Sequence, residues 1–142
     1  MRSASDAAVR AWVTLVHTHR VALSAVERAL KSAGLPPLDW YDVLLELERA
    51  GPLRPRELQA RLLFAQPNLS RLLDRMEGAK LVERGRCAED ARGQLVCLGA
   101  AGKALRRRMW PIYAAAIEET VGAKLTDTQA EQLAGLLGRL KS

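Results

Sequence analysis

The sequence predicts a mainly α-helical fold with one small β-hairpin. Apolar residues recur at helical spacing through most of the chain, and only residues 81–98 hold two short strand-like runs around a polar, turn-prone segment. The length of 142 residues fits one domain. A hydrophobic content of 49% excludes a disordered chain. No apolar run reaches the roughly 20 residues of a membrane span, and the first residues do not resemble a signal peptide. We therefore expect a cytoplasmic protein that does not enter a membrane.

The first helix is expected from Asp6 to Ala33. Gly34 and the Pro36–Pro37 pair end it. Because so long a helix exceeds what one small core needs, we expect it to pack partly against a second chain. Its apolar side chains form one stripe in two rows, each repeating every seven residues: Val9, Val16, Leu23 and Leu30, then Trp12, His19 and Val26.

Three shorter helices are expected next, over residues 39–49, over residues 55–62, and from residues 65–68 to about Gly78. Pro55 suits the first position of a helix. Residues 81–84 and 94–98 then form the hairpin, with a long charged tip between them. A helix over residues 101–123 follows, and Pro111 is expected to kink it. Thr126 and Gln129 match the capping box that opens the last helix, over residues 126–140.

The chain carries a net charge of +6, and the basic excess lies after residue 50. This balance favours an anionic partner such as nucleic acid, an acidic membrane surface or an acidic protein. The sequence holds no glycine-rich phosphate loop, metal-binding His pair or nucleophile motif, so we expect no enzyme, no metal and no cofactor. Cys87 and Cys97 lack the spacing of zinc ligands, and two reduced thiols are expected rather than a disulfide.

The order helix, helix, turn, helix and two-stranded ribbon is that of a winged helix-turn-helix. Residues 38–102 resemble the MarR family of bacterial transcription regulators. The segments that carry the resemblance lie in the second helix, the third helix, the recognition helix, the entry to the wing and the wing tip: residues 38–44, 56–62, 68–77, 78–84 and 90–93.

The resemblance implies a winged helix-turn-helix lobe at residues 38–99, embedded in a dimerisation layer made by residues 1–37 and 100–142. It further implies a homodimer, a palindromic double-stranded DNA site, and repression relieved by a small aromatic or phenolic ligand bound between the two layers. Repression and activation use the same groove contacts, so the sequence alone does not distinguish them.

The expected DNA contacts follow from base and phosphate chemistry. Asn pairs with adenine and Arg with guanine in the major groove, whereas Arg in the wing suits the minor groove. Asp90 is expected to brace the wing by pairing with Arg75 or Arg92. The recognition-helix set is Gln66, Pro67, Asn68, Ser70 and Arg71; Arg92 is the wing residue; Arg84, Arg86, Arg54 and Arg56 are phosphate candidates. A solvated surface is expected for Lys103 and Arg106–Arg108.

Three positions depart from the family pattern. Ala65 replaces the Ser that usually caps the recognition helix, which predicts the loss of a cap worth about 1 kcal/mol. Gly99 replaces a capping Thr, and Ala91 replaces a basic residue beside Arg92. We expect these changes to tune DNA binding without altering the fold.

The effector site is less defined by the sequence. The candidate ligand residues are Trp12, His19, Asp39 and Trp40, with core or dimer packing as the competing interpretation for the aromatic side chains. His19 is expected to be packed and hydrogen-bonded. Two other functions stay open: a protein-interaction module that keeps the fold without reading an operator, and a thiol-based redox regulator that uses Cys87.

Overall fold

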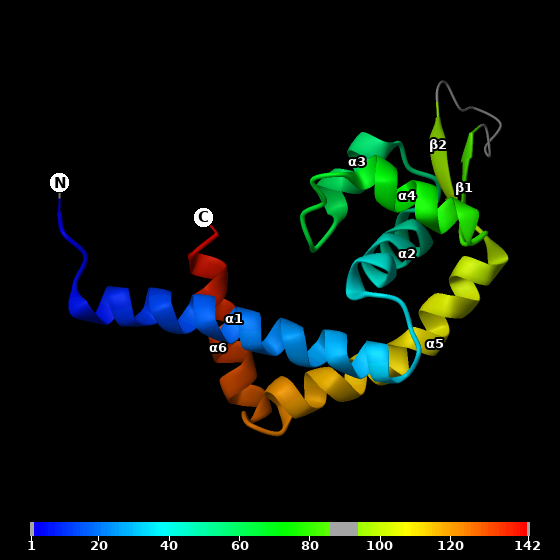
Figure 1. The fold of residues 1–142 in the computed structure, drawn as a ribbon. Coiled ribbons are helices and arrows are strands. Elements are labelled where there is room, and N and C mark those ends of the chain that lie inside the picture. Colours follow the sequence, from blue (N-terminus) through cyan, green and yellow to red (C-terminus); the bar gives the residue numbers. More distant parts are fainter. Residues whose placement is uncertain (1, 86–93, 142) are drawn as a thin grey trace.

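Residues 2–85 and 94–141 are described by the structure, a computed structural model. The predicted class is confirmed, since the described chain is mainly helical with one hairpin (Figure 1). In chain order the elements are α1 (Asp6–Ser32), α2 (Leu38–Ala50), α3 (Pro55–Arg61), α4 (Leu69–Gly78), β1 (Val82–Gly85), β2 (Leu95–Leu98), α5 (Ala100–Ile117), a π-helical turn (Glu118–Gly122) and α6 (Asp127–Arg139).

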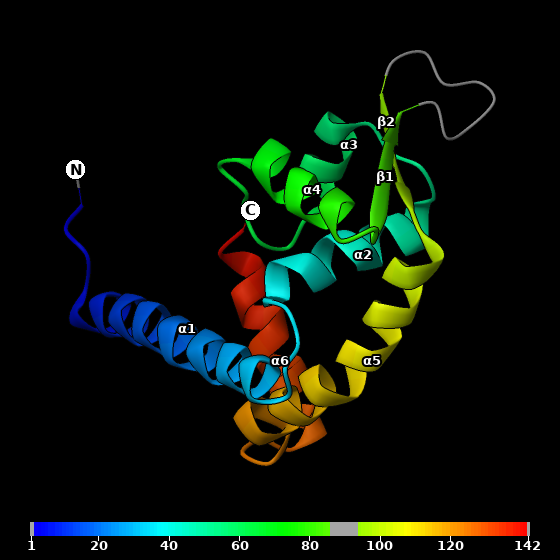
Figure 2. The same cartoon turned by 45° about the vertical axis from the view of Figure 1, so that its right-hand side comes forward.

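Helix α1 projects from the rest of the molecule. Ser5 caps its start by accepting a 3.1 Å hydrogen bond from the backbone N–H of Ala8. In this helix only Val26 and Leu30, both near its C-terminal end, are buried in the described structure. Figures 1 and 2 show the N-terminal half of α1 extending away from the body.

Helices α2, α3 and α4 and the two strands gather into one lobe above α1 and α5 (Figure 2). The core of this lobe consists of fully buried aliphatic side chains and one thioether: Val43, Leu44, Leu58, Leu73, Met76 and Val96. Burying each such side chain contributes about 1.5–3 kcal/mol, so this cluster holds the short helices together.

The hairpin is antiparallel, with Val82 opposite Leu98 and Arg84 opposite Val96. Leu53, just before α3, exchanges two backbone hydrogen bonds with Val96, of 3.1 and 2.7 Å. This bridge fixes the start of α3 to β2, so the ribbon and the helices share one rigid frame.

Helix α5 packs against the entry to β1, and Gly102 makes this possible. A Cβ at position 102 would lie 2.2 Å from the carbonyl oxygen of Leu81. Pro111 lies inside α5 as expected, and the helix continues through it. The single helix predicted over residues 101–123 ends earlier, because its last turn is π-helical. The capping box of α6 is confirmed, since Thr126 and Gln129 exchange hydrogen bonds of 3.0 and 3.1 Å.

Candidate nucleic-acid interface and adjoining groove

Helix α4, the recognition helix of the predicted motif, starts later than the sequence suggested. Asn68 is its N-cap, and the Asn68 Oδ1 accepts a 3.1 Å hydrogen bond from the backbone N–H of Arg71. Gln66 and Pro67 therefore lie in the turn before the helix. The cap that we expected to be lost at Ala65 is supplied by Asn68, so that expectation was wrong. This cap uses one of the two lone pairs of the Asn68 oxygen and leaves the NH2 group of Asn68 as a donor for a base.

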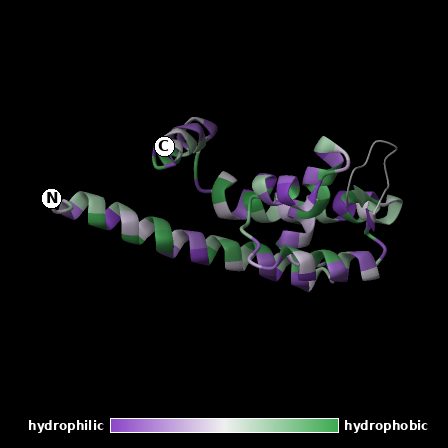
Figure 3. Ribbon diagram, turned by 90° about the horizontal axis from the view of Figure 1, so that it is seen from above, coloured by the Kyte–Doolittle hydropathy of each residue, from purple (hydrophilic) through white to green (hydrophobic). Residues whose placement is uncertain are grey.

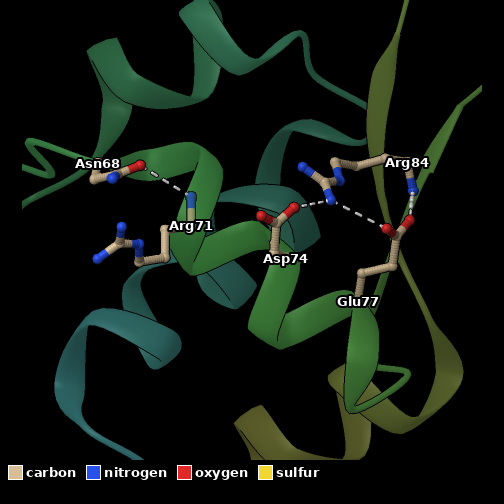
Figure 4. Close-up of polar contacts among 5 residues, drawn as sticks. All are labelled: Asn68, Arg71, Asp74, Glu77 and Arg84. Atoms are coloured by element: carbon tan, nitrogen blue, oxygen red, sulfur yellow. Dashed lines mark hydrogen bonds and ion pairs between the residues drawn. The ribbon is translucent and has the colours of Figure 1, made fainter.

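Helix α4 is amphipathic, with one buried apolar face and one exposed polar face. Leu69, Leu72, Leu73 and Met76 are buried, whereas Ser70, Arg71 and Arg75 are exposed. Exposed cations at the start of a helix that is held rigidly by its apolar side are what insertion into a DNA groove requires. Figure 4 shows Asn68 and Arg71 at the start of the helix, well separated from Asp74 and Glu77.

A shallow groove of about 500 Å³ separates the starts of α3 and α4. Arg56, Pro67, Asn68 and Ser70, all predicted DNA-contacting residues, line it together with Gln59. The Gln59 side chain donates a 2.8 Å hydrogen bond to the carbonyl oxygen of Gln66, which fixes the turn before α4. Gln59 was not predicted as a site residue, because an exposed polar side chain two residues before Arg61 gives no signal in the sequence. Arg54 is also exposed, at the N-cap of α3.

Arg84 lies differently from the other cations. Its guanidinium pairs with Asp74 and, at 3.1 Å, with Glu77, both on α4. The second oxygen of Glu77 accepts a 2.9 Å hydrogen bond from the backbone N–H of Arg84. These bonds lower the pKa of Glu77, and the bond to Asp74 is the main cause of the raised pKa of Arg84. The structure thus brings Arg84 to the recognition helix rather than to a free surface.

Several predictions fall on residues outside the described ranges: the wing residues Arg86, Asp90 and Arg92, the departure at Ala91, and the redox role of Cys87. Cys97 lies on β2 and is disulfide-bonded, so the expectation of a reduced thiol at this position was wrong. A Cys side chain joined to another sulfur has no S–H to titrate or alkylate.

A second concave surface lies below the lobe. This aromatic groove, of about 770 Å³, opens between α2, the α3–α4 turn and α5. Tyr41 packs edge-on against Tyr113, with ring centroids 5.1 Å apart, and stacks on Trp110 at 6.2 Å. Its lining combines aromatic, aliphatic and charged side chains: Leu38, Tyr41, Asp42, Leu45, Glu46, Arg49, Arg61, Leu62, Leu63, Phe64, Arg106, Trp110, Tyr113, Ile117 and Lys141.

Charge in the aromatic groove is mixed but predominantly positive. Arg106 pairs through its Nε with the carboxylate of Glu48, so the expectation of a solvated surface was wrong at this position. Arg106 is half-buried, whereas Lys103, Arg107 and Arg108 are exposed. Asp42 is buried in the groove wall, and burial raises its pKa. Burial likewise raises the pKa of Tyr113.

The four predicted ligand residues do not meet in the aromatic groove. Trp40 packs against the core, and Trp12 is exposed on α1. His19 is exposed rather than packed, and it lines a smaller adjoining groove of about 200 Å³. Asp39 lies at the start of α2, where its Oδ1 is buried without a hydrogen-bond partner in the described structure. The groove residues Tyr41, Trp110 and Tyr113 were noted from the sequence only as aromatic pocket or interface candidates.

Helices α1 and α6 expose large apolar side chains. Trp12 is 66% exposed and Leu140 67% exposed, and Val9, Val13, Val16 and Leu136 are also open to solvent. Figure 3 shows hydrophobic segments along the projecting part of α1. No helix in the described ranges is both long and apolar enough to span a bilayer. The same ranges hold no cluster of three or more His, Cys, Asp or Glu that could bind a metal ion.

Known proteins similar to this chain have the same winged helix-turn-helix fold. The MarR family model matches residues 33–93. The structure of AbsC, a MarR family transcriptional regulator from Streptomyces coelicolor, is 25% identical with a TM-score of 0.84, over 99% of this chain and 96% of that one. Sco3205 from the same organism, solved in complex with DNA, is 24% identical with a TM-score of 0.86, over 99% and 90%.

A third similar structure concerns the regulation of DNA binding of Bordetella bronchiseptica BpsR by 6-hydroxynicotinic acid. It is 20% identical with a TM-score of 0.78, over 90% of each chain. The family match covers the helix-turn-helix described above, and the structural matches extend over nearly the whole chain. Residues 33–93 therefore match the MarR family of transcriptional regulators, and the chain as a whole has the fold of AbsC and Sco3205.

Proposed function

We propose that the protein is a homodimeric repressor that binds a palindromic operator through α4 and releases it when a small aromatic anion enters the aromatic groove. The observation that carries the DNA-binding part is the two-sided α4, with a fully packed apolar face and exposed Ser70, Arg71 and Arg75. We expect it to act in the cytoplasm, where the chromosome lies.

The base contacts are assigned to the turn and first helical turns of α4. Arg71 and the amide of Asn68 suit base edges, and Gln66, Pro67 and Ser70 lie beside them. Arg54, Arg56 and Arg75 suit phosphates because they are exposed, at the N-cap of α3, on α3 and on α4 respectively. The net positive charge of the chain adds non-specific attraction for DNA.

Helices α1 and α6 support the homodimer, because both expose large apolar side chains in the single chain. Helix α6 buries no residue against the described chain, yet Leu133, Leu136, Leu137 and Leu140 line one side of it. An isolated helix of 13 residues is marginal in water. A second copy presents a matching pair of apolar helices, so a two-fold interface covers both sets at once.

The ligand class follows from the chemistry of the aromatic groove. Tyr41, Trp110 and Tyr113 offer ring faces, and Arg49, Arg61 and Arg106 outweigh Asp42 and Glu46 in charge. An aromatic carboxylate or phenolate satisfies both features. 6-Hydroxynicotinic acid, which regulates the DNA binding of BpsR, belongs to this class. The groove volume of about 770 Å³ is ample for one such molecule.

The test is selection of duplexes from a random-sequence library with the purified full chain. The proposal predicts enrichment of an inverted repeat whose half-sites lie about one helical turn apart, since a two-fold dimer reads two half-sites. Enrichment of a single half-site would contradict the dimeric mode, and no enrichment would favour an interaction module instead. Adding 6-hydroxynicotinic acid, with benzamide as a neutral control, then tests whether an aromatic anion releases the selected duplex.

A further inference from the structure

We propose that Arg84 is a positioning residue for DNA binding: held by Asp74 and Glu77, it fixes the β1–β2 ribbon on the recognition helix and contacts no phosphate. The inference rests on DNA binding through α4. It reassigns a cation that the sequence alone presents as one more phosphate contact.

Glu77 holds Arg84 at two points. One carboxylate oxygen accepts from the backbone N–H of Arg84 at 2.9 Å, and the other pairs with its guanidinium at 3.1 Å. Asp74, one helical turn earlier on the same face of α4, pairs with the same guanidinium nitrogen. Figure 4 shows the Arg84 side chain reaching across to both carboxylates. A group held through its backbone and its side chain together cannot rotate away without breaking both bonds.

Electrostatics argue against a phosphate contact. Two carboxylates face one guanidinium, so the cluster as a whole is negative. The Arg84 side chain is only 20% exposed, whereas Asp74 is 61% exposed. A phosphate approaching this face meets the acidic groups first, and reaching Arg84 would require breaking an existing ion pair. Among the described ion pairs, no carboxylate pairs with the exposed Arg56 or Arg71.

The place of the cluster in the chain explains why positioning matters. Between α4 and β1 lies a short turn in which Lys80 adopts a positive φ of 63°. The Glu77–Arg84 bonds span this turn, and together with the Leu53–Val96 bridge they set the angle between ribbon and helix. Two DNA-contacting elements bind together only when this angle matches the duplex.

The experiment measures two quantities for each full-length variant by fluorescence anisotropy. The first is the ratio of affinities for a duplex selected by the wild-type chain and for a shuffled duplex of equal length. The second is the slope of log Kd against log salt on the shuffled duplex. The ratio cancels any loss of folded protein, whereas the slope counts phosphate contacts, with about 0.9 per contact.

For Arg84→Gln we expect the ratio to fall about tenfold, the effect of roughly one mismatched base pair, and the slope to stay unchanged. Arg56→Gln is the matched control, with a slope lowered by about 0.9 and an unchanged ratio. A lowered slope with an unchanged ratio for Arg84→Gln would make Arg84 a phosphate contact and overturn the proposal. Two unchanged values would overturn it as well.

A second variant keeps Arg84 and removes the two carboxylates that bind it. For Asp74→Asn with Glu77→Gln we expect a lower ratio and a steeper slope, because Arg84 becomes free to meet phosphate. An unchanged ratio in this variant would also contradict the proposal, even if Arg84→Gln did not fold. If the wild-type chain itself prefers no duplex, operator reading fails. That outcome is distinct from a wild-type preference that Arg84 does not affect.

Discussion

The buried carboxylate of Asp42, on α2, accepts a 2.9 Å hydrogen bond from the backbone N–H of Phe64, in the turn between α3 and α4. This bond ties the helix-turn-helix to the wall of the aromatic groove, because both residues line that groove. A ligand that displaces Phe64 therefore acts on the same turn that positions α4.

Asp42→Ala should destabilise the protein by about 1–3 kcal/mol, because the Phe64 N–H loses its acceptor inside the structure. Asp42→Asn is the control, since the Asn oxygen can still accept that bond. The free energy of unfolding in urea, measured at one protein concentration, separates the two. Equal stability of the Ala and Asn variants would show that the Phe64 hydrogen bond contributes nothing.

The raised pKa of Asp42 predicts a specific pH dependence. Burial is the main cause of the shift, and it outweighs the backbone N–H groups of Phe64 and Leu63. The folded state therefore holds the Asp42 proton more tightly than the unfolded state, whose value is near 3.8. The stability of the wild type relative to Asp42→Asn should fall as the pH rises from about 4 to about 7. A relative stability that increases with pH over this range would contradict the raised pKa of Asp42.

The pair between Arg106 and Glu48 joins α5 to α2 beside the aromatic groove, and both side chains are largely covered. Arg106→Gln should cost about 1–2 kcal/mol, between the values for exposed and for buried pairs. The exposed Arg107 supplies the control, and Arg107→Gln should leave the urea midpoint unchanged. Equal effects of the two substitutions would mean that the pair with Glu48 adds no stability.

Val16→Glu on the exposed stripe of α1 should convert the proposed dimer to monomers, because it would place a charge in the proposed apolar interface. The side chain is 49% exposed in the single chain, so the monomer should stay folded. Sedimentation velocity measures the change, with Thr18→Glu, exposed on the same helix, as the control. A dimeric Val16→Glu variant would place the interface elsewhere.

Gly102→Ala should destabilise the protein by about 1–3 kcal/mol, since the added Cβ would overlap the Leu81 carbonyl. Gly78→Ala, at a helical position with open space around it, should be neutral or stabilise by up to about 1 kcal/mol. Thermal unfolding of the two variants compares them directly. Similar midpoints would show that α5 can move away from β1 at little cost.

Local signals in the sequence predicted the helices and the hairpin. The capping box at Thr126 and Gln129 and the turn at Gly34 depend on neighbours in the chain, and both agree with the structure. The start of α4 was misplaced because Pro67 was interpreted as part of the first turn, whereas Asn68, the next residue, is the stronger cap.

The site was only partly predictable because its key pairs join distant positions. Glu48 and Arg106 lie 58 residues apart, and Asp42 and Phe64 lie 22 apart. A single sequence shows the charges but not their partners, so Arg84 was expected to contact a phosphate and Arg106 to face solvent. The same limit applies to the aromatic groove, where Tyr41 meets Trp110 and Tyr113 only through the packing of α2 on α5.

The most direct measurement is fluorescence anisotropy of the purified chain on the intergenic duplex beside its own gene, with a scrambled duplex of equal length as control. We predict tight binding to the native duplex alone, with two chains per duplex, and we expect this binding to survive an increase to near-physiological salt. Equal, salt-sensitive binding to both duplexes would mean that the net charge of +6 alone attracts DNA. That result would contradict sequence-specific binding through α4.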